Sequence, residues 1–242
     1  MQFSDDLEFS DRERKEVYDY VERHGRVDYH RARQALGMEE APFGHYVASL
    51  KRHGFVERSG DELRVAFESE EPERFDEELS FRIRQAGEDD LEPLVAAIRE
   101  ALADGTYIVA ENLADVIDRE HVLLRHNDVQ TRVVFLATVA DQVAGWVHLD
   151  APEVAKLDHT AEMTVGVVPE HRGHGVGSRL LERGVRWADE HGYQKVYNSV
   201  PATNDSAIDW LEARGWEGEA VRENHYRIDG ELVDEVMMAH YT

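Results

Sequence analysis

The sequence predicts an α/β (α+β) protein in which a mixed, mostly antiparallel sheet flanked by helices follows a small helical domain. Two observations carry this prediction. Over residues 162–188, a β-branched run, a glycine-rich turn and an amphipathic stretch follow one another as strand, turn and helix. Around residues 68–73 the chain becomes acidic and contains a proline, as solvated linkers do. We therefore expect domains at 1–67 and 81–242, joined by a linker over 68–80.

Residues 1–67 show the pattern of three helices followed by a hairpin. Apolar residues at helical spacing mark the core face of each helix, and glycines end the second and the third. Two short strands then meet at a Ser-Gly-Asp turn. The first helix is indicated by Val17, Tyr20 and Val21, the second spans 29–37, and the third is indicated by Tyr46, Val47, Leu50 and Gly54. The two strands are 55–57 and 63–67. This order resembles a winged helix-turn-helix domain.

Such a domain can bind DNA or another protein, and the sequence leaves both open. A winged helix would present Lys51, Arg52 and His53 at the end of its third helix, with Arg58 and Arg64 on the wing. A DNA-binding domain normally carries a basic surface, whereas this one has 11 basic and 14 acidic side chains, net −3. In a salt-rich cell the electrostatic contribution to DNA binding is already weak, so a locally basic surface is compatible with DNA binding. The alternative is that this domain docks on a protein or forms a dimer.

The C-terminal part alternates strands and helices. We expect a strand at 81–84, helices over 89–102 and 113–125, a hairpin of 133–137 and 143–147 through Asp141-Gln142, strands at 162–168 and 193–200, and a closing hairpin around Asp229-Gly230. The amphipathic helix after the glycine-rich turn places Leu180, Leu181, Val185 and Ala188 on one face. These elements together give the mixed sheet and its flanking helices.

The most informative segment is 165–177, VGVVPEHRGHGVG. Its strand ends at Pro169, and three glycines at alternate positions, Gly173, Gly175 and Gly177, lead into the helix. A strand, glycine turn and helix direct unpaired amides and the helix dipole at an anion, here a pyrophosphate. The helix start lacks the Lys of a Walker A loop, and no reading of the glycines completes G-x-G-x-x-G.

Two segments match signatures of the GNAT N-acetyltransferases, and the chain therefore resembles that family. They are Arg172-x-x-Gly175-x-Gly177, which matches R/Q-x-x-G-x-G/A, and Asn204-x-x-Ala207 with the turn Gly215-Trp216, which matches N-x-x-A and a Gly-Phe turn. The resemblance covers residues 81–242. It implies the GNAT fold, acetyl-CoA as co-substrate and direct transfer of an acetyl group to a primary amine.

The resemblance also implies where acetyl-CoA binds. The backbone of Val165, Gly166 and Val167 would follow the pantetheine arm, with the Val167 amide donating to the thioester carbonyl, and Asn204 would bond the same arm. The pyrophosphate would be held by Arg172, Gly173, His174, Gly175, Val176, Gly177 and Ser178.

Two positions that relatives use for proton transfer are changed here. Leu211 stands in place of the general-acid Tyr, and Ser199 stands in place of a Glu five residues before the signature Asn. A lysine amine is only ~0.1% neutral at neutral pH, so its proton needs an acceptor. The resemblance points to Glu162, on the strand beside the pantetheine, as the catalytic base. The other candidates are His159, His225, Tyr226 and a conducting water.

Two functions follow from these residues. One is an acetyl-CoA-dependent N-acetyltransferase acting on a protein lysine, a protein N-terminus or a small polyamine-like amine. The other is a DNA-binding transcriptional regulator whose GNAT-like domain senses acyl-CoA or a small molecule. The intact glycine loop with Asn204 favours the enzyme, whereas the Leu at position 211 favours the sensor. We therefore adopt the hypothesis that the protein is an enzyme.

The composition of the chain bears on its environment, its cofactors and its partners. The chain has 51 acidic and 27 basic side chains, a formal charge of −24, which is typical of a halophilic protein in a salt-rich cytoplasm. The absence of cysteine excludes disulfides and thiolate chemistry, and His171, His174 and His191 form no compact ligand set, so we expect no metal. No apolar run reaches the ~18 residues that span a bilayer. With an acidic start and no signal-like segment, we expect a cytoplasmic protein without a membrane partner, and a homodimer stays open.

Overall fold

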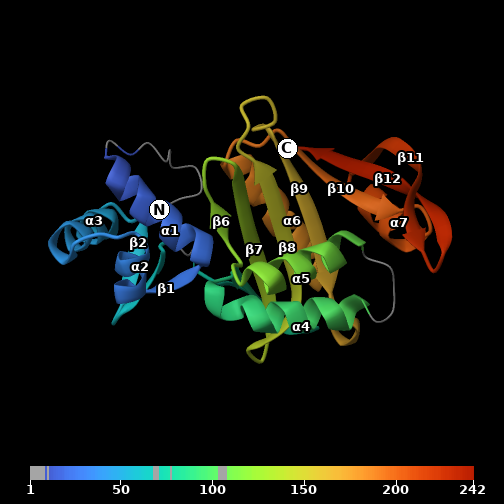
Figure 1. Cartoon of the computed structure of the whole chain (residues 1–242). Coiled ribbons are helices and arrows are strands. Elements are labelled where there is room, and N and C mark those ends of the chain that lie inside the picture. The colour runs from blue at the N-terminus through green and yellow to red at the C-terminus, as the bar shows by residue number, and fades with distance from the viewer. Residues whose placement is uncertain (1–8, 10, 68–70, 77, 103–107) are drawn as a thin grey trace.

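The computed structural model describes residues 9, 11–67, 71–76, 78–102 and 108–242, and it consists of an N-terminal unit beside a larger sheet (Figure 1). In the N-terminal unit, α1 (Arg12–His24), α2 (Tyr29–Ala35) and α3 (Glu40–Arg52) pack with the strands β1 (Arg26–Asp28), β2 (Val56–Ser59) and β3 (Glu62–Val65). The three helices and the β2–β3 hairpin are confirmed. The strand β1, which pairs antiparallel with β3, was not predicted because three residues show no periodicity.

The larger sheet has nine strands within the described residues. Eight of them lie in the order β11-β12-β10-β9-β8-β7-β5-β4, and β6 pairs with β7 at the side. The bounds are β4 (Glu73–Asp76), β5 (Ser80–Gln85), β6 (Arg125–His126), β7 (Gln130–Val139), β8 (Gln142–Pro152), β9 (Thr160–Val167), β10 (Lys195–Pro201), β11 (Glu217–Ile228) and β12 (Glu231–Tyr241). Every pairing is antiparallel except that of β9 with β10, so the prediction of a mixed, mostly antiparallel sheet is confirmed.

Helices cover both faces of this sheet. The helix α6 (Val176–Glu190) packs on one face, where Phe135 of β7 and Leu180 of α6 share an apolar cluster. The helices α4 (Leu91–Leu102) and α5 (Ile108–Glu120) pack on the other face with Val134 and Leu136 of β7. Successive residues of β7 thus enter opposite cores, as a central strand requires. The short helix α7 (Asp205–Glu212) follows β10.

Both predicted hairpins are present, and the first turns at Ala140-Asp141, one residue before the predicted Asp141-Gln142. Ala140 and Asp141, between β7 and β8, both have positive φ (47° and 66°), and so do Asp229 and Gly230 between β11 and β12 (50° and 89°). Two residues with positive φ match the right-handed twist of the strands that they join. Asp229-Gly230 is the sequence signal expected of such a turn.

Two expected boundaries differ. The second helix of the C-terminal part was predicted over 113–125, whereas α5 ends at Glu120 and is followed by β6. The 68–80 stretch was predicted as a solvated linker, yet β4 lies within it and pairs with β5. Phe75 of β4 stacks on Phe81 with ring centroids 5.0 Å apart, so this strand has an apolar anchor despite its acidic surroundings. Residues 68–70 and 77 lie outside the described residues.

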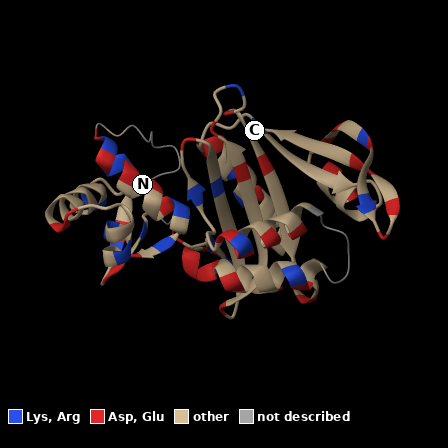
Figure 2. Cartoon of the chain, in the orientation of Figure 1, with Lys and Arg blue, Asp and Glu red and all other residues tan. Residues whose placement is uncertain are grey.

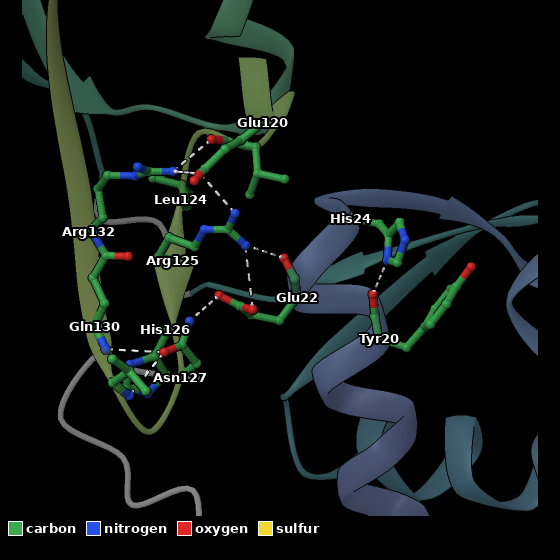
Figure 3. A network of polar contacts seen from close by, with 12 residues as sticks. Tyr20, Glu22, His24, Glu120, Leu124, Arg125, His126, Asn127, Gln130 and Arg132 are labelled. Atoms are coloured by element: carbon green, nitrogen blue, oxygen red, sulfur yellow. Dashed lines mark hydrogen bonds and ion pairs between the residues drawn. The ribbon is translucent and has the colours of Figure 1, made fainter. Parts of the chain in front are cut away.

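The N-terminal unit is fixed to the sheet by buried polar contacts (Figure 3). Tyr18 of α1 donates to the backbone oxygen of His126 at 2.8 Å. Glu22, 6% exposed, lies 3.6 Å from Arg125 and accepts from the Asn127 side chain at 2.8 Å. Because these groups are largely removed from water, removal of one partner would leave the other buried and unpaired, so the two parts depend on these contacts.

Acidic side chains occur on both parts of the molecule (Figure 2). Within the part of the chain that the structure describes, no helix is long and apolar enough to cross a membrane.

Candidate active site

The candidate site begins where β9 and β10 separate. Their parallel pairing runs from Thr160 and Lys195 to Glu162 and Tyr197, yet β9 continues to Val167. The last residues of β9 therefore pair with β8 on one side only. A strand edge without a partner strand presents main-chain donors and acceptors to a ligand.

The direction of these free groups follows from one hydrogen bond. The amide of Val168 donates to the oxygen of Ala144, just before the β8 pairing, at 3.0 Å. Because main-chain groups alternate along a strand, the amide of Gly166 also faces β8, whereas the amides of Val165 and Val167 face the gap. The gap thus contains the two donors that the sequence placed beside the pantetheine.

Glycine is required at position 166 by the packing of a neighbouring side chain. A Cβ atom at this position would lie 2.3 Å from the ring of Trp146. The absence of that atom lets the Trp146 ring pack directly against β9, and Trp146 also lines the cavity described below. The prediction that the backbone of 165–167 lines the site is consistent with this packing.

The glycine-rich turn brings β9 directly to the start of α6. Gly173 and Gly175 have φ values of +81° and +82°, which favour glycine, and Gly175 is the N-cap of α6. The first bond of the helix runs from the Arg179 amide to the Gly175 oxygen at 3.1 Å. The amides of Val176, Gly177 and Ser178 precede that bond and so have no partner within the helix. Free amides and the positive end of the helix dipole can hold an anion, so the geometry is compatible with the anion site that the sequence predicts.

Arg172 fastens this turn to two other elements. Its Nε donates to the oxygen of Val167 at 3.0 Å, and its Nη2 donates to the oxygen of Ala101, in α4, at 3.1 Å. The sequence placed Arg172 among the residues that hold the cofactor. The contacts of its guanidinium give it a further role, because they position the loop against the end of β9.

One cavity of about 620 Å³ joins the gap and the glycine-rich turn. Of the residues predicted to bind the cofactor, most line it: Val165, Gly166, Val167, Arg172, Gly173, Gly175, Gly177, Ser178 and Asn204. His174 is not among the lining residues, because its side chain is exposed and points Nδ1 toward Glu78 at 3.9 Å. The side chain of Val176 is buried in the core, which leaves only its amide for a ligand.

The cavity also has walls that the motifs did not predict. Arg214 reaches from beyond α7 to the Ser178 hydroxyl at 2.9 Å and lies over the Trp210 ring, 4.2 Å from its centroid. Ser199 and Thr164 add hydroxyls from β10 and β9. Asn204 caps α7 by accepting from the Ala207 amide at 3.2 Å. The sequence singled out Ser199 only as the replacement of a family Glu, and no motif distinguished Thr164 or Arg214.

Glu162 lies at the end of the gap and does not line the cavity itself. It is the residue where the β9–β10 pairing stops, two positions before Thr164, which does line the cavity. Burial, together with the charges of Asp150 and Glu235, raises the pKa of Glu162 above its usual value. A carboxylate with a raised pKa is a stronger base, which suits the predicted role.

The other predicted candidates lie in different surroundings. Tyr226 donates to Glu235 at 2.9 Å; burial and this bond raise its pKa, which disfavours it as an acid. His225 lies 3.7 Å from the same carboxylate. His159 precedes β9, beside Asp158 at 3.9 Å and half-exposed. Leu211, in place of the family Tyr, is buried in the core.

The histidines near the glycine-rich turn contact neighbouring backbone and carboxylate oxygens. His191 lies with Nδ1 2.7 Å from the Trp187 oxygen, and His171 lies 3.3 Å from Glu170. Among the residues that the structure describes, no three or more His, Asp or Glu side chains are grouped as a metal site would need.

Comparison with known proteins identifies the family to which this fold and its glycine-rich turn belong. The model of the acetyltransferase (GNAT) family matches residues 61–216, and the chain belongs to this family.

Among curated proteins, the [ribosomal protein bS18]-alanine N-acetyltransferase of Escherichia coli strain K12 is 28% identical over 83 residues, which is 34% of this chain. The match covers 56% of that protein, so the chain spans a little over half the length of this relative.

Solved structures of the family share the fold. A GNAT acetyltransferase from Streptococcus pneumoniae aligns over 67% of this chain and 99% of its own, with 22% identity and a TM-score of 0.54. A putative acetyltransferase from Salmonella typhimurium, solved with its cofactor acetyl-CoA, aligns over 66% and 93%, with 19% identity and a TM-score of 0.55. A ribosomal-protein-alanine N-acetyltransferase from Brucella melitensis aligns over 66% and 99%, with 22% identity and a TM-score of 0.53.

Proposed function

We propose that this protein is an acetyl-CoA-dependent N-acetyltransferase that passes an acetyl group directly to a primary amine. The observation that carries the proposal is the continuity of one cavity, which runs from the free edge of β9 to the start of α6. An elongated thioester with a pyrophosphate needs such a pair of sites, main-chain donors for an amide-containing arm and unpaired helix amides for the phosphates.

The residues have separate tasks in this proposal. The amides of Gly177 and Ser178, with Arg214 beside them, hold the pyrophosphate. The Val165 main chain pairs with the pantetheine arm, and the Val167 amide donates to the thioester oxygen. That donor stabilises the negative charge that develops on the oxygen when nitrogen attacks the carbonyl carbon.

Glu162 supplies the base. The acceptor enters as an ammonium ion and transfers one proton to the Glu162 carboxylate. The nitrogen lone pair then forms the C–N bond to the carbonyl carbon. The C–S bond breaks, the nitrogen releases its second proton to solvent, and the sulfur leaves as a thiolate that takes a proton from solvent. Because Leu211 offers no hydroxyl, the thiolate leaves without a Tyr donor from α7.

The acceptor in this proposal is a cationic primary amine, and a protein N-terminus is the first choice to test. The E. coli relative is named for acetylation of an alanine of a ribosomal protein. Asp150, Glu162 and Glu235 give the end of the gap an acidic character that suits an ammonium group.

The N-terminal unit is proposed as a winged helix that docks the enzyme on a partner. Its three helices and β2–β3 hairpin have the expected order, and Lys51, Arg52 and His53 are exposed at the end of α3. Its buried contacts with β6 support a fixed platform over a free tether.

Thiol release measured in molar KCl, the expected working salt of so acidic a protein, tests the activity. The assay uses acetyl-CoA with spermidine, lysine and a peptide that begins with alanine. We expect amine-dependent release of CoA with one of them and an acetylated amine by mass spectrometry. Binding of acetyl-CoA without release on any amine would contradict the enzyme and favour the sensor.

A further inference from the structure

Four polar side chains lie in one row across the face of the sheet that α5 covers. Strand register places Arg132 of β7 opposite Asp150 of β8, Asp150 opposite Glu162 of β9, and Glu162 opposite Tyr197 of β10. Directly opposite residues of paired strands project from the same face with Cβ atoms ~5 Å apart. Two carboxylates therefore lie side by side at the point where β9 and β10 separate.

The two carboxylates differ in how they are held. Asp150 accepts a hydrogen bond from the Gln130 side chain at 2.6 Å and lies beside Arg132. Arg132 is itself anchored to the oxygens of Leu123 (3.1 Å) and Val122 (2.9 Å) and to Glu120 (3.0 Å) (Figure 3). Among the described residues no group donates a hydrogen bond to the carboxylate of Glu162. One acid is thus fixed and the other is free to bind a proton.

A second observation points to an occupant at this place. The hydroxyl of Thr164 is buried and has no hydrogen-bond partner among the described residues, although Thr164 lines the cavity. Thr164 follows Glu162 on the same face of β9. A buried hydroxyl without a partner costs stability unless a ligand or water completes it, so an N–H group or a water belongs between the cavity and Glu162.

We propose that Asp150 and Glu162 work as a carboxylate pair, in which Glu162 takes the proton of the acceptor ammonium and Asp150 sets the pH range over which it does so. This inference rests on the proposed function. The proton moves from nitrogen to the Glu162 carboxylate, and Asp150 keeps its own bonds to Gln130. Asp150 is thereby a positioning residue, because it acts only through Glu162.

The charges around Glu162 agree with this assignment. Burial and the charges of Asp150 and Glu235 raise the pKa of Glu162, and burial raises that of Asp150 although Gln130 and Arg132 oppose the shift. Other titratable and charged side chains lie on the elements packed around this row.

These neighbours come from every adjoining element. His148 on β8 stays neutral because its pKa is lowered to about 3, and Tyr197 lies on β10. Glu235 on β12 has Arg222, His225 and Tyr226 of β11 as its partners. The helix α5 carries the exposed acids Glu111 and Asp115.

A carboxyl titration of Glu162 in the full-length protein tests the pair without any acceptor. Carbon-13 labelling of glutamate carboxyls, with Glu162 identified by its loss in Glu162→Gln, gives its pKa by NMR. In Asp150→Asn, whose amide oxygen can still accept from Gln130, we expect the Glu162 pKa to fall by about one unit. Asp158→Asn, an exposed acid 57% accessible in the β8–β9 turn, should leave it unchanged.

The opposite results overturn the pair. An unchanged or higher Glu162 pKa in Asp150→Asn would show that Asp150 does not act on it. If that variant does not fold, the wild-type curves of Asp150 and Glu162 decide, because coupling gives Glu162 a second titration step at the midpoint of Asp150 and independent acids give no such step. Where an acceptor is turned over, the acid limb of kcat/KM should move to lower pH by the same amount in Asp150→Asn. Failure of transfer with a two-step titration would count against the proposed function alone.

Discussion

The backbone oxygen of Val167 accepts a hydrogen bond from Nε of Arg172 at 3.0 Å, and this bond closes the turn between β9 and α6. The same guanidinium reaches the Ala101 oxygen at the end of α4. A single side chain thus ties the glycine-rich turn to the end of β9 and to the end of α4. Its geometry explains why an arginine, with several donors in a fixed plane, suits this position.

Arg172→Ala should weaken acetyl-CoA binding about tenfold or more, because two hydrogen bonds from a charged donor are lost and the loop is no longer held. Calorimetry of acetyl-CoA binding measures the loss. Arg99→Ala on α4 removes an exposed ion pair with Asp118 of α5 and serves as the control, with unchanged affinity expected. Equal affinities in the two variants would remove Arg172 from the site.

Gly175→Asp should abolish acetyl-CoA binding. The position has φ of +82° and caps α6, so the substitution adds backbone strain and places a negative charge where the phosphates bind. Gly37→Asp, with φ of +64° and open space around it in the N-terminal unit, carries a similar strain far from the cavity. If Gly37→Asp lost binding as fully as Gly175→Asp, the effect would be one of folding.

Gly166→Ala should destabilise the protein by about 1–3 kcal/mol, because the added methyl group overlaps the Trp146 ring and overpacks the core. Gly87→Ala, where a Cβ would meet nothing within 4 Å, should cost far less. Chemical denaturation of both variants gives the two free energies. A similar cost at the two positions would show that the Trp146 contact is not what requires glycine.

Arg125→Ala should loosen the N-terminal unit, with a loss of about 3 kcal/mol, because Glu22 is left buried without its cation. All four tryptophans lie in the sheet-based part, so their fluorescence follows that part alone, whereas circular dichroism follows both. We expect the two transitions to separate in Arg125→Ala and to coincide in the exposed control Arg119→Ala. Coincident transitions in both would show that other contacts join the parts.

His148 should make the protein less stable as the pH falls. Burial and the charge of Arg132 lower the pKa of its imidazole to about 3 in the folded state, whereas the unfolded chain binds a proton near pH 6.5. Below pH 6.5 the unfolded state therefore binds more protons, and stability falls by ~1.4 kcal/mol per pH unit toward pH 3. His148→Leu should flatten this slope, and the exposed His24→Leu should leave it. A slope unaffected by His148→Leu would assign it to other groups.

Local patterns were sufficient to predict the elements that depend on a single period or turn. Asp229-Gly230 and Asp141 gave the hairpins, and the spacing of Leu180 and Leu181 gave α6 with its buried face. The glycine loop was predictable for the same reason, since Gly173 and Gly175 are needed for positive φ within one short segment.

Features that depend on distant residues could not be predicted. Phe75 identifies β4 only through its stacking on Phe81, and acidic neighbours concealed that strand in an expected linker. The Arg214–Ser178 contact joins residues 36 positions apart, and the Asp150–Glu162 pairing requires the β8–β9 register. The periodicity of apolar residues within one segment does not predict such contacts, because they depend on the pairing and register of the whole sheet.

Calorimetric titration of acetyl-CoA and desulfo-CoA into the full-length protein in molar KCl tests the central claim most directly. The account predicts micromolar binding of both ligands, because the pyrophosphate and pantetheine contacts do not involve the sulfur. It also predicts that Gly175→Asp removes the binding of both. Absence of binding in wild-type protein shown to be folded would contradict the assignment of this cavity to acetyl-CoA.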